Sequence, residues 1–188
     1  MSTGTSGAST HTVTLKKYGL MFTLPTHWQE IPLTGSDISG LLDLVTKADP
    51  SMKSSLTTEV KQAAKAGVKI FALGPIVKKF ATNINVIVEP QPTGPSTAGY
   101  FDQLGVEVKL NLAGAGMKEI KTSKLQWPQG EVLQATYALH LSSPVMVVKG
   151  IQDYVWHKGK IFIVTISSLT LSADEAVAAV VGHSWHWS

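Results

Sequence analysis

The chain has 188 residues, of which 44% are hydrophobic and 15% charged, a balance that is typical of a globular domain and excludes a disordered chain. Its net charge of +3 includes sixteen basic residues, all of them lysine. Because arginine makes the bidentate contacts that read phosphates and base edges, its absence argues against nucleic-acid recognition. The chain also has no cysteine, which excludes disulfides, thiolate catalysis and cysteine-based metal sites.

The first ten residues are only Met, Ser, Thr, Gly and Ala. Such a segment has nothing to bury, so we expect residues 1–11 to form a flexible tether ahead of a single domain at 12–188. A frayed terminus explains the same composition, and both interpretations stay open. The start lacks the basic and apolar regions of a signal peptide, and no apolar run approaches the ~20 residues that cross a bilayer. We therefore expect either a cytoplasmic protein or the mature form of an exported one.

The first half of the chain mixes strands and helices. Alternating apolar residues on both sides of a Tyr18–Gly19 turn predict a strand pair. Apolar stripes at helical spacing predict a helix at 37–48, which Pro50 stops, and a second at 56–66, which ends at Gly67.

The middle of the chain continues this mixture. β-Branched strands are expected at 68–74 and 82–92, separated by a loop that carries Pro75 and two lysines. A longer helix is then expected from Ser96 or Thr97 to about Leu112, followed by a glycine-rich turn. A phosphate-binding loop would need those glycines between a strand and the start of a helix, which is the opposite order.

The second half reads as a meander that ends in a helix. Strands are predicted at 118–127, 131–141, 145–156 and 161–169, with Lys158–Gly159 in a tight hairpin turn. A last helix is expected to be capped by Ser172 and to end at Gly182. Strands outnumber helices and most neighbours are antiparallel, which predicts an α+β fold: an antiparallel β-sheet of about six to eight strands flanked by α-helices.

Five segments, taken in order, resemble the PsbP-like superfamily, which also includes Mog-type proteins and actinobacterial lipoproteins of the LpqN kind. These segments are YGLMFTLPTHW (18–28), FATNINVIVEP (80–90), WPQGEVLQATY (127–137), YVWHKGKIFIVTISS (154–168) and VVGHSWHW (180–187). The resemblance runs from about residue 12 to residue 188. It implies an α/β/α sandwich that serves as a docking surface, since the known members are mostly binding and assembly factors.

The resemblance also implies a cellular setting. Tethers rich in serine, threonine and glycine are similar to those of exported bacterial lipoproteins, whose lipid-bearing cysteine would precede Met1. We therefore expect a non-enzymatic interaction domain outside the cytoplasm, anchored at the cell surface, with a protein partner in the cell envelope and no cofactor. If no export signal precedes the chain, the location is cytoplasmic instead. The alternative function is to bind a small ligand, a lipid or a sugar, in an apolar pocket between the sheet and the helices.

Histidine and serine give weak indications of chemistry. His183 and His186 lie three residues apart, with His157 as a third candidate ligand for zinc. We expect no metal site, because Gly182 is predicted to end the helix before this pair and no HExxH or similar motif is present. Ser184 beside His183 does not make a catalytic dyad by adjacency, and no nucleophile-elbow motif occurs, so no catalytic residues are predicted.

The five tryptophans are the remaining candidates for function. Exposed tryptophan is typical of binding hot spots, whereas buried tryptophan is commoner. Trp28, Trp127 and Trp187 are predicted as the candidate binding surface. Trp185 is expected to plug the core, which leaves His183 and His186 facing solvent.

Overall fold

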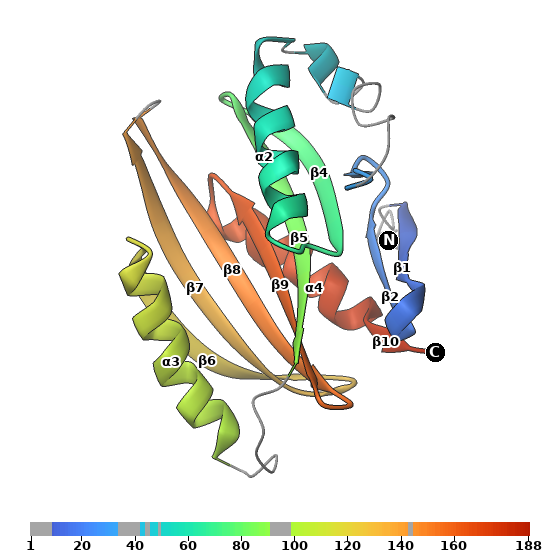
Figure 1. Ribbon diagram of the computed structural model, residues 1–188, viewed down its shortest axis with the longest axis vertical. Coiled ribbons are helices and arrows are strands. Elements are labelled where there is room, and N and C mark those ends of the chain that lie inside the picture. Colours follow the sequence, from blue (N-terminus) through green and yellow to red (C-terminus); the bar gives the residue numbers. More distant parts are fainter. Residues whose placement is uncertain (1–8, 34–41, 44–45, 49, 91–98, 143–144) are drawn as a thin grey trace, which may run out of the picture.

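A seven-stranded antiparallel sheet in the order β3-β4-β5-β9-β8-β7-β6 carries the fold (Figure 1). The structure is a computed structural model and describes residues 9–33, 42–43, 46–48, 50–90, 99–142 and 145–188. The sheet strands are β3 (Gln29–Glu30), β4 (Ile70–Val77), β5 (Phe80–Pro90), β6 (Lys118–Trp127), β7 (Gly130–Ser142), β8 (Val145–His157) and β9 (Lys160–Ser168). The predicted α+β class and sheet size are confirmed.

The meander from β6 to β9 follows directly from local sequence. Apolar and polar residues alternate along much of β6 and β7, and β9 is a mostly apolar run. The β6–β7 and β8–β9 turns contain Gly130 and Gly159, both at positive φ. Lys158 and Gly159, at φ of 47° and 73°, form the β8–β9 turn with both central residues left-handed, as two-residue hairpins require. This turn pairs His157 with Lys160 and holds both at the same end of the sheet.

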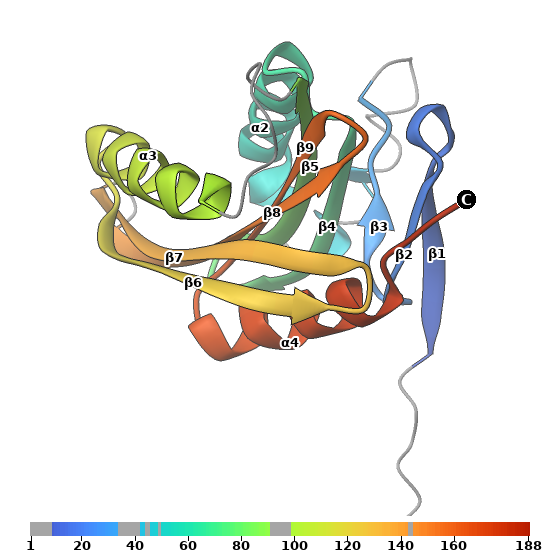
Figure 2. The ribbon, with the colours of Figure 1, turned by 90° about the horizontal axis from the view of Figure 1, so that it is seen from below.

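Helices cover both faces of the large sheet (Figure 2). On one face, α2 (Lys53–Lys65) packs over β4 and β5, and α3 (Tyr100–Gly114) packs over β6 and β7. The other face is covered by α4 (Leu171–Ser184) and by a small three-stranded sheet. No helix in the described ranges is long and apolar enough to span a membrane.

The small sheet joins the two ends of the described chain. It contains β1 (Thr10–Leu15), β2 (Leu20–Pro25) and β10 (His186–Trp187), with β2 in the middle. The short 3-10 helix η1 (Lys16–Tyr18) and the left-handed Gly19 form the connection between the antiparallel strands β1 and β2. The backbone N–H of Thr23 also donates to Oγ of Ser184 at 2.9 Å, which fastens the end of α4 to β2.

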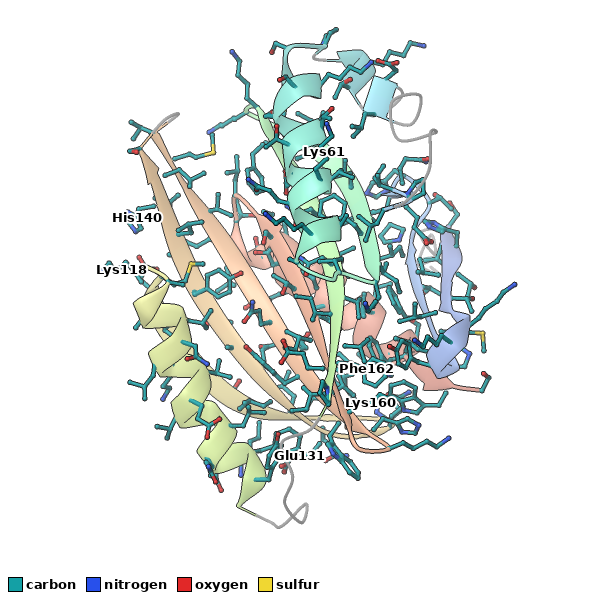
Figure 3. All side chains as sticks on the ribbon, in the orientation of Figure 1. Lys61, Lys118, Glu131, His140, Lys160 and Phe162 are labelled. Carbon is teal, nitrogen blue, oxygen red and sulfur yellow. The ribbon has the colours of Figure 1, made fainter. Side chains whose placement is uncertain are left out.

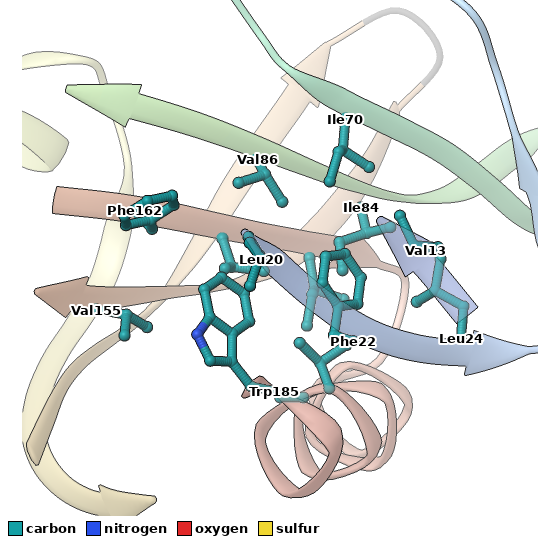
Figure 4. Close-up of a cluster of buried hydrophobic side chains, with 14 of the residues drawn as sticks. Val13, Leu20, Phe22, Leu24, Ile70, Ile84, Val86, Val155, Phe162 and Trp185 are labelled. Atoms are coloured by element: carbon teal, nitrogen blue, oxygen red, sulfur yellow. The ribbon is translucent and has the colours of Figure 1, made fainter. Parts of the chain in front are cut away.

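A large apolar core lies between the small sheet, α4 and the large sheet (Figure 4). Trp185 is fully buried at its centre, with its ring stacked on Phe22 at a centroid distance of 5.6 Å and an interplanar angle of 9°. Phe162 meets the same indole edge-on at 6.2 Å. The prediction that Trp185 plugs the core is confirmed.

Several boundaries differ from the sequence prediction. Gly182 lies inside α4, which continues to Ser184. The glycine does not stop the helix but lets Trp127 pack closely against it, since a Cβ there would lie 2.6 Å from Cε2 of Trp127. Thr170, rather than Ser172, is the N-cap of α4. Pro75 belongs to β4 at a register shift, and the tight turn falls on Lys78–Lys79.

The remaining elements complete the comparison with the sequence. The α2 helix begins at Lys53, ahead of the predicted residue 56, and Gly67 follows its end, as predicted, with a left-handed backbone at a φ of 79°. Two short 3-10 helices, η2 (Thr46–Ala48) and η3 (Pro50–Met52), precede it. Most of the helix predicted at 37–48, the proposed caps at Ser96 and Thr97, and the tether up to residue 8 lie outside the described residues. The strand β1 begins at Thr10, so the last two residues assigned to the tether belong to the hairpin.

Candidate functional site

Three segments that are far apart in the sequence meet at one end of the domain. They are the η1 turn, the β8–β9 turn and β10. We call the exposed and half-buried residues at this meeting point the basic aromatic end, which comprises Lys16, Lys17, Tyr18, His157, Lys158, Lys160 and Trp187. Figure 3 shows Lys160 and Phe162 at this end of the molecule, remote from Lys61 on α2.

The aromatic part of this end is a continuous stack that grows out of the core. The rings of His157 and Trp187 lie parallel, with centroids 3.9 Å apart and an interplanar angle of 7°. Trp187 also contacts Phe162 at 4.8 Å and the buried Trp185 at 5.5 Å. Partial burial, together with the neighbouring charge of Lys158, lowers the pKa of His157, so its ring stacks in the neutral form at pH 7. The stack gives Trp187 a fixed orientation at the surface.

The basic part surrounds Tyr18. The Nζ atoms of Lys17 and Lys160 lie 5.7 and 6.0 Å from the centre of the Tyr18 ring, close enough for a cation–π attraction. The same ring meets Phe162 edge-on at 5.7 Å, which fixes its position. Two ammonium groups from opposite ends of the chain therefore converge on one tyrosine.

No acidic side chain neutralises these lysines within the described part of the chain. The ion pairs found there join Lys53 to Asp43, Lys124 to Asp102 and Lys149 to Glu119, all away from this end. The segments 15–20, 157–162 and 183–188, which build the basic aromatic end, contain no aspartate or glutamate. The arrangement is therefore a cationic surface with an aromatic centre, suited to binding an anionic partner.

A groove of about 290 Å³ runs between α4 and β6. Its walls are Leu125 and Trp127 on one side and the α4 residues Ala178 and Ala179 on the other, with Gln134 at its floor. Behind that floor, Nε2 of Gln134 donates to Oδ1 of the fully buried Asp153 at 2.8 Å.

The buried carboxyl behind the groove has an altered pKa. Burial raises the pKa of Asp153 to about 7, and the hydrogen bond from Gln134 offsets part of that rise. Glu175 and His183 stand on the rim of the groove. The groove therefore has an apolar body with a few polar groups, the chemistry of a small-ligand site at the small end of the usual size range.

Comparison with known proteins identifies the fold. No family model matches the chain and no curated protein matches it. Among solved structures, the chain is similar to the cyanobacterial PsbP (CyanoP) of Synechocystis sp. PCC 6803, with 16% identity, coverage of 100% of this chain and 98% of that one, and a TM-score of 0.54. This is the PsbP fold. A second solved structure, LpqN of Mycobacterium tuberculosis, which is involved in cell envelope biogenesis, matches with 11% identity, coverage of 94% and 84%, and a TM-score of 0.49. The predicted resemblance to PsbP-like proteins is confirmed for the fold.

Within this PsbP fold, the three tryptophans predicted as a binding surface lie in different settings. Trp28 is only 2% exposed and packs on Gly74, where a Cβ would lie 2.7 Å from its ring. Trp127 is 9% exposed and lines both the groove and a smaller hollow of about 150 Å³. Trp187 is half-buried in the basic aromatic end. The structure thus separates the three residues, and Trp187 has the most prominent surface position among them.

Sequence reasoning missed Trp156, which is 39% exposed. It precedes His157 on β8, so its side chain lies on the opposite face of the hairpin, where it lines the smaller hollow with Trp127. The signal was available in the alternation along β8 close to the predicted Lys158–Gly159 turn, because a residue at a strand end lies beyond the cover of the helices.

The histidine pair is engaged with the backbone. Nδ1 of His183 lies 2.7 Å from the carbonyl of Ala179, and Nδ1 of His186 lies 2.8 Å from the carbonyl of Ser184. Both side chains are exposed, as predicted. No group of three or more histidine and acidic side chains suited to a metal occurs among the described residues of this PsbP fold.

Proposed function

We propose that this chain is a non-enzymatic docking domain that works outside the cytoplasm, held near a bacterial membrane by the tether at its start. The observation that carries the proposal is the basic aromatic end, where lysines that form no ion pair among the described residues surround an oriented aromatic stack. The composition of residues 1–10 and the resemblance of the sequence to exported lipoproteins support the location. Half-buried aromatic rings beside cations are typical of a surface that binds another surface.

The buried carboxyls support a role without catalysis. Burial raises the pKa of Asp153, Asp174 and Glu59 to about 7 in each case, a range useful for acid–base chemistry. Asp153 and Asp174 are fully enclosed, and Glu59 accepts a hydrogen bond from Asn83 on the other face of the sheet. A general acid or base must reach a substrate, whereas Asp153 and Asp174 are enclosed and face Gln134 and Ser168 respectively.

The test is position-specific photo-crosslinking in intact cells that produce the full chain. A photoreactive residue at Lys158 should give crosslinked products, whereas the same residue at Lys61, on the exposed face of α2, should give none. Cell fractionation of the same strain should place the protein in the envelope. Recovery from the cytosol, or equal crosslinking from both positions, would contradict the proposal.

The second candidate function is to bind a small apolar ligand, a lipid or a sugar, in the groove between α4 and β6. The observation that favours it is the groove itself, with apolar walls and the Gln134 amide at its floor. A thermal-shift screen with lipids and sugars should show stabilisation that is lost in Ala179→Trp, which fills the groove. Ala176→Trp, an exposed position on the same helix that does not line the groove, should keep it. Equal behaviour of the two variants would reject this function.

A further inference from the structure

We propose that the basic aromatic end docks onto the surface of an anionic lipid bilayer. This inference deepens the docking function proposed above and rests on it, because it names the partner as a layer of acidic lipid headgroups. Three features of the described residues lead to it: the kind of cation, the position of the aromatic rings and the rigidity of the whole end.

The lysine ammonium groups of the basic aromatic end match a surface on which negative charges are distributed without fixed positions. Lys16, Lys17 and Lys158 are exposed, and Lys160 is half-buried beside Tyr18. An ammonium group is a compact point charge that binds a phosphate without a fixed geometry, whereas a protein partner with placed carboxylates is best matched by the arginine fork. The chain has no arginine. A cluster of four lysines is also within the range that is typical of attraction to acidic lipid headgroups.

The aromatic rings lie where a bilayer interface would need them. Trp187 and Tyr18 stand on one side of the β8–β9 turn, and Trp156, with 39% of its surface exposed, stands on the other side. Tryptophan and tyrosine have an apolar body and one polar group, and they concentrate at the level of lipid headgroups. Lys158 lies in the turn between these two faces, and Lys160 lies over the Tyr18 ring, so charge and aromatic surface occur together at this end of the sheet.

The end is preorganised by the backbone. The backbone N–H of Ser188 donates to the carbonyl of Gly19 at 2.7 Å, which ties β10 to the η1 turn. Gly19 has a φ of 64°, and an added Cβ there would lie 2.8 Å from the carbonyl oxygen of Ser188, so this close approach depends on glycine. Because the lysines and rings are held on strands and tight turns, little conformational entropy is lost on docking.

The experiment is co-sedimentation of the full chain with vesicles of phosphatidylglycerol and phosphatidylcholine, compared with phosphatidylcholine alone. We expect binding to the mixed vesicles only, and its loss in the quadruple variant Lys16→Gln, Lys17→Gln, Lys158→Gln, Lys160→Gln. Each lysine near an anionic surface contributes roughly fivefold in affinity, so the loss of four should weaken binding by about 600-fold.

A matched control removes the same charge elsewhere. Lys61, Lys65, Lys78 and Lys79 are exposed and lie outside the basic aromatic end, and Figure 3 shows Lys61 remote from it, so replacing these four by Gln should weaken binding only slightly. Replacing the four docking lysines by arginine should preserve binding. Such a result would show that the quadruple Gln variant loses vesicle binding because it loses charge. Equal weakening by the two Gln variants would refute the inference, because net charge alone would then explain the binding.

Two further arms separate the sources of negative charge. Inorganic phosphate at millimolar concentration should not release the chain from vesicles beyond the effect of ionic strength; specific release would mean that a free anion is the ligand and would overturn the inference. Failure to bind phosphatidylglycerol vesicles, combined with retained crosslinking from Lys158 to a protein in cells, would also overturn it while leaving the docking function intact. If both vesicle binding and crosslinking fail, the docking function falls with it.

Discussion

The plug formed by Trp185 gives the sharpest test of the core. Its side chain is fully buried and contacts four aromatic rings, with centroid distances between 5.5 and 6.2 Å. Trp185→Ala removes a large buried ring and leaves a cavity, which in protein cores costs about 3–5 kcal/mol. The indole N–H has no hydrogen-bond partner among the described residues, so no polar interaction adds to this figure.

The measurement is chemical and thermal unfolding of the purified chain. For a domain of this length, each kcal/mol lowers the melting temperature by roughly 2–4 °C, so a cost of about 3–5 kcal/mol should lower it by about 6–20 °C. Trp185→Phe keeps a ring in the stack with Phe22 and should lose about half as much or less.

A surface tryptophan is the matched control. Trp156→Ala, at a position with 39% of its surface exposed, should cost about 1 kcal/mol or less. A melting temperature for Trp185→Ala within about 3 °C of the wild type would refute the plug. The ring would then be available to a ligand instead of the core.

Further predictions concern close packing and protonation. Gly182→Ala should destabilise the domain by about 1–3 kcal/mol, because the added Cβ would lie 2.6 Å from the Trp127 ring, whereas Gly114→Ala, with nothing within 4 Å, should be neutral or slightly stabilising in urea unfolding. Similar unfolding curves for the two variants would contradict the close contact. Burial raises the pKa of Asp153 to about 7, so the folded chain keeps a proton that the unfolded chain releases near pH 4; the free energy of unfolding should therefore fall by up to about 4 kcal/mol between pH 4 and pH 7. Asp153→Asn should flatten this part of the pH dependence in urea unfolding and raise stability at pH 7.5 relative to the wild type. A slope identical to that of the wild type would show that Asp153 ionises freely in the folded state.

The parts of the fold that local sequence determines were predicted well. The strands β6 to β9 form at the segments rich in alternating or continuous apolar residues, and the Lys158–Gly159 turn adopts two left-handed residues. The short strands β3 and β10 were not predicted, because two residues show no periodicity. Each is a strand only because it pairs with a longer strand, β3 with β4 and β10 with β2. Gly182 shows a different limit: a glycine near a helix end predicts a stop, whereas here the missing Cβ admits a tryptophan from another strand.

The basic aromatic end was only partly predictable. Trp187 was a candidate from composition, but nothing near it in sequence indicates that His157 stacks on it or that Lys17 and Lys160 share one tyrosine. These contacts depend on β2 pairing with β10 and on the β8–β9 turn lying beside η1. Long-range topology, and not local pattern, brings the charges together.

The small sheet has a consequence for the order of folding. Because β2 pairs with β10, and Ser184 accepts from Thr23 across 161 residues of sequence, this layer cannot close until the last strand has left the ribosome. The meander from β6 to β9 has mostly local pairings and should form earlier, leaving the N-terminal hairpin unpaired along one edge in the meantime. Trp185 packs on Phe22 of β2 and on Phe162 of β9, so this core is complete only once these distant segments have come together.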